Sequence, residues 1–307
     1  MHYSVMLKEV IESLQLKDDG IYVDATLGYA GHTREILKRV KRGFIFAFDQ
    51  DTDAILYSQE KLEQIANNFL IIKSNFLYVK EELEKRNVFN IDGILFDLGV
   101  SSPQLDNKDR GFSYRFNSKL DMRMDKTASL SAYEVVNNYQ ENDLARIIFQ
   151  YGEEKYAKNI AKNIVRERTI KPIETTFELV EIIKKSMPKK DTFDKNPARR
   201  TFQAIRIEVN HELDILEDSL KKALSLLNIG GRMVVITFHS LEDRIVKNVF
   251  KEVSEVDKLV KGLPEIPDAY LPKFKLVEKK AISPSDFELL ENRRSRSSHM
   301  RVIERIR

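Results

Sequence analysis

The side chains best suited to chemistry stand where short apolar runs end. One β-branched, apolar run ends in Asp24, and Gly28 and Gly31 follow it closely; a second apolar run ends at Asp49. Glycines let the backbone turn sharply and approach a ligand, and an acidic residue ~20 residues further on commonly holds a ribose diol. The spacing predicts a nucleotide site formed by a strand, a glycine loop and a helix N-terminus.

A third apolar run ends at Asp97 and leads into a compact polar turn. The turn offers two hydroxyls, a proline and an amide, on Ser101, Ser102, Pro103 and Gln104. Carboxyl ends of parallel strands meet at one edge of a sheet, so we expect Asp97 beside the glycine loop. The turn suits a flat, hydrogen-bonding substrate. A capped turn without a ligand is the alternative.

The glycine loop departs from the dinucleotide fingerprint G-x-G-x-x-G. Only Gly28 and Gly31 are glycines, and Ala30 occupies a position where another is common. The missing glycine disfavours a nicotinamide-dependent dehydrogenase, for which the chain also offers no credible acid at a hydride site. For the loop taken alone, an α/β turn that binds nothing stays open.

The elements around these residues predict an α/β fold. Nearly continuous apolar strands alternate with amphipathic helices, which indicates a parallel sheet covered on both faces. We expect strands over residues 21–24, 44–49, 69–72, 91–97 and 232–238, and helices over 5–16, 33–41, 52–65, 79–86, 199–209 and 212–227. Asp51 or Thr52 is the expected cap of the third helix. Two final strands, 274–281 and 300–306, should pair antiparallel.

Between residues 107 and 200 the strand pattern stops. Helical spacing predominates there, over 132–138, 141–151, 157–168 and 176–186. The chain therefore reads as one sheet domain, 1–107 and 203–307, interrupted by a helical insertion, 108–202. Aromatic residues of the insertion (Phe112, Tyr114 and Phe116) are either base-stacking or core residues.

Composition narrows the class of protein. The chain has 307 residues, of which 42% are hydrophobic and 32% charged, and it has no cysteine. That excludes disulfides and thiolate metal sites and suits a reducing cytoplasm. No apolar run approaches the ~20 residues of a membrane span. The net charge is only +3, but Lys and Arg residues cluster in two stretches, 184–206 and 293–307. Such clusters suit a polyanionic partner.

Seven motifs in consistent order make a specific resemblance. They are DATLGYAGH (24–32), DLGVSSPQLD (97–106), RGFS (110–113), LDMRMD (120–125), NPARRTFQAIR (196–206), FHSLEDR (238–244) and SRS (295–297). Together they resemble the ribosomal RNA small subunit methyltransferase H family, also called MraW. The resemblance implies a class I, Rossmann-like methyltransferase sheet with an inserted all-helical domain for RNA recognition. It also implies S-adenosylmethionine-dependent methylation of the N4 amine of a cytidine in 16S rRNA, near the decoding centre of the small ribosomal subunit.

The resemblance implies cofactor contacts for single residues, and the chemistry of the side chains suggests catalytic and RNA-binding roles for others. Expected cofactor contacts are Asp24, Gly28, Ala30, Gly31, His32, Asp49, Phe76, Asp97 and Gln104. Expected catalytic residues are Asp97, Ser101, Ser102 and Pro103, which would accept hydrogen bonds from the amine or position it. Expected RNA contacts are Arg199, Arg200, Arg206, Arg293, Arg294 and Arg296. No metal site is expected, and His211 and His239 are interpreted as structural.

One departure from the family concerns the glycine loop, where Gly-Gly-His is usual and this chain has Ala30 before Gly31 and His32. An alanine is tolerated there at negative φ and strained at positive φ. Two rival functions stay open: a cytosine-N4 methyltransferase acting on DNA, and a ribosome-assembly factor that binds RNA without turnover. The sequence leaves the choice between monomer and homodimer open.

Overall fold

The computed structural model describes residues 4–192, 196–256, 260 and 262–307, and the chain divides into two compact units. The first comprises Met1–Gly99 and Leu213–Arg307, and the second comprises Val100–Glu212. The insertion, expected over 108–202, thus lies inside a longer continuous unit. Among the described residues, none of the helices is both long and apolar enough to span a membrane.

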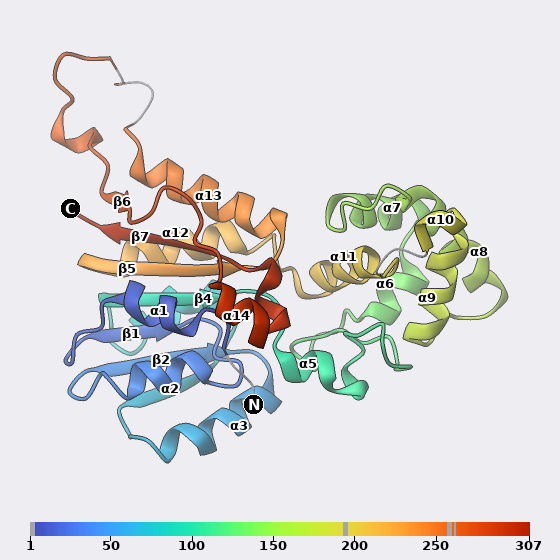
Figure 1. Ribbon diagram of the computed structural model, residues 1–307, viewed down its shortest axis with the longest axis horizontal. Coiled ribbons are helices and arrows are strands. Elements are labelled where there is room, and N and C mark those ends of the chain that lie inside the picture. Colours follow the sequence, from blue (N-terminus) through green and yellow to red (C-terminus); the bar gives the residue numbers. More distant parts are fainter. Residues whose placement is uncertain (1–3, 193–195, 257–259, 261) are drawn as a thin grey trace. The chain divides into compact units, whose positions relative to one another are not determined.

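The first unit is built on a seven-stranded sheet of order β3-β2-β1-β4-β5-β7-β6 (Figure 1). The strands are β1 (Ile21–Asp24), β2 (Phe44–Asp49), β3 (Phe69–Lys73), β4 (Ile91–Asp97), β5 (Leu227–Thr237), β6 (Phe274–Leu276) and β7 (His299–Arg305). β3, β2, β1, β4 and β5 run parallel, whereas β7 is antiparallel to both β5 and β6. This topology confirms the Rossmann-like sheet and its antiparallel finish.

Alternation along the strands supplies two cores. In β1, Val23 faces one core and Tyr22 the other. The core around Val23 is completed by α4 (Val79–Glu84), α12 (Leu216–Leu226) and α13 (Ser240–Ser254); the core around Tyr22 is completed by α1 (Leu7–Leu14), α2 (Gly31–Leu37) and α3 (Thr52–Glu63). Because successive side chains of a strand point to opposite faces, continuous apolar runs require helices on both. Asp51 caps α3, accepting from the backbone N–H of Asp53 at 3.1 Å.

Two expectations about the later strands are wrong. β5 begins at Leu227 rather than after Gly231, because residues 228–231 bulge within the strand: its register with β4 shifts between Ile91 and Gly93. Gly230 adopts φ +81°, and glycine can take this positive φ in a bulge without steric cost because it has no Cβ. β6 ends at Leu276, because the exposed, charged residues 278–280 leave the ladder before an isolated bridge at Ile282.

The second unit is helical around one core of its own. Its helices are α5 (Ser102–Asp106), α6 (Ala132–Asn138), α7 (Glu141–Gln150), α8 (Ala157–Ile170), α9 (Thr176–Lys185), α10 (Lys189–Thr192) and α11 (Arg199–Asn210). Phe112 is 5% exposed in this core, and Tyr114 packs edge-on against Phe202 with ring centroids 5.7 Å apart. Those two aromatic residues are therefore structural. The described residues of 107–200 form no strand, only an isolated bridge between Lys119 and Thr175.

Candidate active site

Three carboxylates end three adjacent parallel strands. Asp24 ends β1, Asp49 ends β2 and Asp97 ends β4. β1 lies between β2 and β4, so these residues share the carboxyl edge of the sheet, as the sequence predicts. We call the three aspartates the carboxylate edge. In open α/β sheets this edge is where ligands bind.

Asp49 is held by backbone N–H groups. Gly28 donates to Oδ2 and Asp51 donates to Oδ1, both at 2.8 Å. Burial nevertheless raises the pKa of Asp49 to about 6, against the opposing effect of these hydrogen bonds. The backbone N–H of Gln50 makes a third hydrogen bond to this carboxylate. A carboxylate has about four acceptor positions, so one stays open for a ribose hydroxyl.

Asp24 holds the glycine loop in place through hydrogen bonds with residues on either side of it. It is 1% exposed, and it accepts hydrogen bonds from the Thr26 backbone at 3.1 Å and the Thr33 hydroxyl at 2.5 Å. Burial raises the pKa of this carboxyl, with the bonds from Thr33 and Thr26 opposing the rise. Asp24 thus joins the two ends of the glycine loop, since Thr26 precedes Gly28 and Thr33 lies in α2.

The ring of His32 and the carboxylate of Asp97 meet through two acceptor atoms, and no hydrogen-bond donor of the described residues lies between them. The Nε2 of His32 lies 3.0 Å from the carbonyl oxygen of Val5, which can only accept, so Nε2 carries a proton. Burial lowers the pKa of His32, so its ring is neutral and Nδ1 has a lone pair. That nitrogen lies 3.6 Å from Oδ2 of Asp97. Two acceptors in this position invite a hydrogen-bond donor.

Asp97 has a strongly perturbed carboxyl. Its side chain is 24% exposed, yet its Oδ1 is buried and has no hydrogen-bond partner among the described residues. Desolvation raises its pKa well above 3.8, and the negative charges of Asp24, Glu242 and Glu288 raise it further. A buried polar atom without a partner is costly, so it marks a place for a ligand. The surplus of carboxylates specifies a cationic one.

The segment before α1 packs against the glycine loop, a contact that the sequence analysis did not predict. A Cβ on Gly31 would lie 1.7 Å from the hydroxyl oxygen of Ser4, so Gly31 is needed for a close approach. The Met6 backbone N–H donates to Oε1 of Glu288 at 2.8 Å, which ties the segment to α14 (Asp286–Glu291). These partners are 282 residues apart, and no local sequence pattern reveals such a contact.

Ala30 adopts the conformation in which its methyl group is strained. It has φ +59° and ψ +23°, the left-handed region, at the N-cap of α2. An L-residue costs roughly 1–2 kcal/mol there relative to right-handed backbone. The side chain is completely buried in the core beside α1 and α2, and burying one methyl group returns about 0.8 kcal/mol. The departure from the family glycine is therefore largely offset locally.

Phe76 begins the 3₁₀-helix η1 (Phe76–Tyr78) after β3 and is half-buried. Its ring meets Phe96 of β4 edge-on, with centroids 5.7 Å apart. Asn75 caps the turn and donates to the side chain of Gln50 at 3.0 Å, which joins the loops after β3 and β2. Phe76 thus packs on the core while standing beside the loop that follows Asp49.

The predicted catalytic turn belongs to the helical unit. Ser101 caps α5: its hydroxyl oxygen accepts from the Gln104 backbone at 3.4 Å, and its own N–H donates to Oε1 of Gln104 at 2.9 Å. Ser102 and Pro103 form the first turn. This reciprocal capping box fixes the turn and gives Ser101 and Gln104 structural roles in addition to those expected of them.

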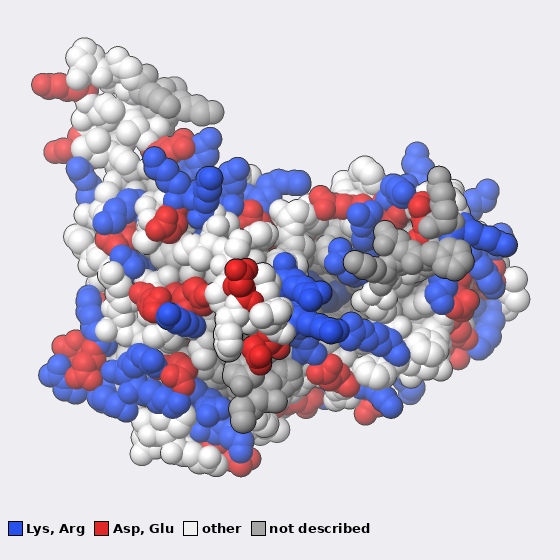
Figure 2. Space-filling model, viewed as in Figure 1, with Lys and Arg blue, Asp and Glu red and all other residues white. Residues whose placement is uncertain are grey.

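The arginines expected to contact RNA differ in exposure and in whether their side chains already pair within the protein. Arg206 makes a bidentate ion pair with Glu212, at 2.7 and 2.8 Å, and both side chains are largely buried. Arg199, Arg200, Arg293 and Arg296 are exposed, whereas Arg294 is half-buried and already engaged. On the face drawn in Figure 2, Lys and Arg lie interspersed with Asp and Glu, so individual arginines matter more than net charge.

Comparison with known proteins decides the family. The model of the MraW methylase family matches residues 1–306. This chain belongs to the MraW methylase family. It is 54% identical over 307 residues to the ribosomal RNA small subunit methyltransferase H of Exiguobacterium sibiricum, covering 100% of this chain and 98% of that relative. The resemblance found in the sequence is confirmed, and the chain is a methyltransferase by family.

Solved structures give a more distant likeness. An rRNA methylase from Streptococcus thermophilus is 12% identical, with 98% of this chain and 94% of that chain covered and a TM-score of 0.44. A candidate methyltransferase from Streptococcus mutans, solved in complex with SAH, is 15% identical, with 99% of each covered and a TM-score of 0.44. The fold assignment therefore rests on the strand topology described above, and the family assignment on the family model and the 54% identical relative.

Proposed function

We propose that this chain transfers a methyl group from S-adenosylmethionine to the N4 amine of a cytidine in 16S rRNA, near the decoding centre of the small ribosomal subunit. The observation that carries the proposal is the buried, unpartnered Oδ1 of Asp97 among carboxylates that raise its pKa. Family membership supports the same reaction. Such a substrate belongs to the cytoplasm.

The residues present fit the cofactor. S-adenosylmethionine carries two positive groups, a sulfonium and an ammonium, which suit an edge with surplus carboxylates. The open acceptor position of Asp49 suits a ribose hydroxyl, and Phe76 offers an apolar surface for adenine. When bound, the cofactor supplies an electrophilic methyl group next to a positive charge.

Asp97 is the proposed catalytic acceptor. The N4 lone pair of cytosine is delocalised into the ring, so alignment and polarisation of the amine matter more than a strong base. A carboxylate that accepts from N4–H increases the electron density on that nitrogen. A nearby cation lowers the pKa of a carboxyl, so cofactor binding keeps Asp97 ionised for this role. His32, neutral and anchored to Val5, is assigned no proton transfer.

The helical unit is the proposed RNA-recognition part. Arg199 and Arg200 are its proposed phosphate contacts, with Arg293 and Arg296 in the other unit, since phosphate contacts position a nucleic acid without reading its sequence. Arg206 is assigned to the ion pair with Glu212 instead. The catalytic roles of Ser101, Ser102 and Pro103 and the cofactor contact of Gln104 stay predictions.

The test is methyl transfer from labelled S-adenosylmethionine to three substrates in parallel: small subunits lacking the modification, naked 16S rRNA and double-stranded DNA. N4-methylcytidine in the subunit or rRNA digest is the expected product. The Asp97→Asn variant should lose it, and Asp19→Asn, which neutralises an exposed aspartate, should not. Label in DNA would favour the DNA methyltransferase instead. Absence of label with intact cofactor binding would favour an assembly factor.

A further inference from the structure

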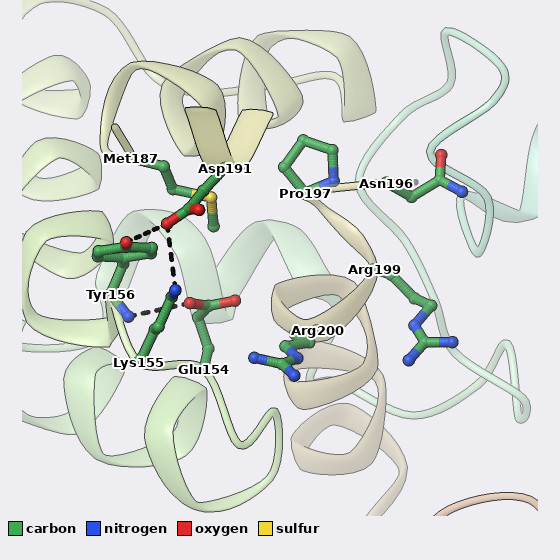
Figure 3. A pocket seen from close by; sticks show the side chains of 9 residues that line it. All are labelled: Glu154, Lys155, Tyr156, Met187, Asp191, Asn196, Pro197, Arg199 and Arg200. Carbon is green, nitrogen blue, oxygen red and sulfur yellow. Dashed lines mark hydrogen bonds and ion pairs between the residues drawn. The ribbon is translucent and has the colours of Figure 1, made fainter. Parts of the chain in front are cut away.

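A cavity in the helical unit has the character of an anion site. It has a volume of about 410 Å³ and lies between the turn before α8 and the first turn of α11 (Figure 3). Lys155 and Tyr156 stand on one wall and Arg199 and Arg200 on the other. No role described so far uses the cavity as a whole.

One of the two acidic groups of the cavity, Asp191, is paired with a cation of the same wall. Asp191 accepts a hydrogen bond from the Tyr156 hydroxyl and pairs with Lys155 at 3.1 Å. Glu154 accepts from the Tyr156 backbone N–H at 2.9 Å. Figure 3 shows the Asp191 contacts on the Tyr156 side, whereas the Glu154 carboxylate is drawn between Lys155 and Arg200. Asp191 is therefore the carboxylate that is paired within its own wall.

The arginine wall is left with uncompensated charge. Arg199 and Arg200 are exposed, and within the described parts of the chain neither side chain makes a hydrogen bond or ion pair. They open α11, whose first turn has no acidic residue and whose N-cap, Ala198, supplies no side-chain acceptor. The helix dipole is positive at this end and adds to the two charges. An anion in the cavity would satisfy all three.

The two walls are held at a fixed spacing by backbone contacts. A Cβ on Gly152 would lie 2.7 Å from the carbonyl oxygen of Arg200, so only glycine permits this approach. The side-chain N–H of Gln203 donates to the carbonyl oxygen of Tyr151 at 3.0 Å. These contacts clamp the turn before α8 onto α11. The cavity is thus formed in advance of binding.

We propose that this cavity holds one phosphodiester group of the RNA substrate, bound by Arg199 and Arg200 together. Guanidinium groups pair with phosphate oxygens in bidentate geometry. Figure 3 draws the two guanidinium groups pointing in different directions from α11, so both exposed side chains turn toward the cavity to share one phosphate. Met187 and Pro197 line the same cavity and offer apolar contact to the attached ribose. The inference rests on the proposed function, because it takes the anion to be part of the RNA.

The test is the salt dependence of RNA affinity, measured on the full chain with a 16S rRNA transcript. Arg199→Gln, Arg200→Gln and the double variant are compared with a control double variant, Arg146→Gln with Arg166→Gln, which removes the same charge from exposed arginines of this unit. Each neutralised phosphate contributes a slope of about 0.7 to 0.9 in log affinity against log salt. A shared phosphate predicts that the double variant loses about one such increment in total. The control should lose none.

A loss of about two increments would overturn the shared phosphate, and an unchanged slope would overturn the site. Cytidine 5′-monophosphate and inorganic phosphate are titrated alongside. Tight binding of either one, abolished in the double variant while the RNA slope is unchanged, would assign the cavity to a free ligand instead. Binding is measured without methyl transfer, so a failed assay for the proposed reaction leaves this test intact. Equal thermal unfolding of the variants excludes misfolding.

Discussion

The carboxylate edge of the sheet unit and the arginine cavity of the helical unit handle charge in opposite ways. At the edge, the carboxylates are buried or half-buried and have raised pKa values, and backbone N–H groups hold Asp49. In the cavity, the side chains of Arg199 and Arg200 are exposed and lack partners among the described residues. A buried charge discriminates strongly but is costly without its ligand. An exposed charge costs little and interacts in a salt-dependent way.

This difference matches two kinds of ligand. A small cation with fixed geometry is suited to a desolvated site, where each hydrogen bond counts. A long polyanion is suited to exposed arginines, because it is attracted from a distance and several contacts share the work. The comparison therefore predicts that cofactor and RNA affinities respond to different perturbations.

The largest effect is expected from Asp97→Asn. Removing one preorganised electrostatic group typically costs about 100- to 1000-fold in rate, so methyl transfer should fall by roughly that factor while RNA affinity stays unchanged. The free protein should become more stable: the pKa of Asp97 is raised on folding, so its ionised form opposes folding at neutral pH. Single-turnover kinetics and thermal unfolding check both. Lower stability of the variant at pH 7 would contradict the electrostatic account.

The next largest effect is expected from low pH, which should weaken cofactor binding at the carboxylate edge but not RNA binding by the arginines. The pKa of Asp49 is about 6, and its protonated form loses acceptor capacity for the ribose. Cofactor affinity should be constant above that pH and fall about tenfold per pH unit below it. RNA contacts by arginine should not change, since guanidinium groups stay protonated. Calorimetry from about pH 5 to about pH 8 measures this.

The matched control for the acid experiment is Asp49→Asn. This variant should bind the cofactor weakly at every pH and should lack the transition attributed to Asp49. A wild-type affinity that stays level down to pH 5 would show that Asp49 does not hold the ribose.

Gly31→Ala should produce an intermediate effect. The new methyl group would meet Ser4, and overpacking of this kind costs about 1–3 kcal/mol. We expect weaker cofactor binding through displacement of His32, whose ring is anchored to the same segment. The second change Ser4→Gly should restore affinity, because it removes both side-chain atoms that lie near Gly31. Failure of that rescue would place the role of Gly31 at the ligand rather than at the segment.

The smallest effect is expected from Ala30→Gly. Relief of left-handed strain and loss of a buried methyl group nearly cancel, so the free energy of unfolding should change by less than about 1 kcal/mol. Gly28→Ala is the informative partner, since φ at Gly28 is +50° and the new residue would be strained. Urea unfolding of both variants measures the asymmetry. Equal destabilisation by the two changes would refute the strain argument.

The sequence predicts the residues at the carboxyl edge of the sheet better than the segments that pack around them. Asp24, Asp49 and Asp97 are recognisable because each directly follows an apolar run, and the helical spacing of 132–138 and 199–209 matches α6 and α11 closely. Both signals are local. The family motifs add the reaction, which no periodicity could supply.

What the sequence missed depends on contacts between distant residues. Neither the close approach of Ser4 to Gly31 nor the bond from Met6 to Glu288 leaves a local pattern. The bulge in β5 was hidden because Gly230 and Gly231 are typical of a turn as well as of an irregular strand. The engagement of Arg206 with Glu212 is likewise invisible when arginines are judged by clustering alone.

The pairing of β4 with β5 has a consequence for synthesis of the chain. Residues 98–226 separate these neighbouring strands, and they take about 6 to 26 seconds to emerge from a ribosome at ~5–20 residues per second. During that interval β4 has an unpaired edge, which is prone to aberrant pairing. The helical unit has its own core, so it can fold while the sheet waits. Slow translation of the insertion would thus prolong the most vulnerable stage in making this enzyme.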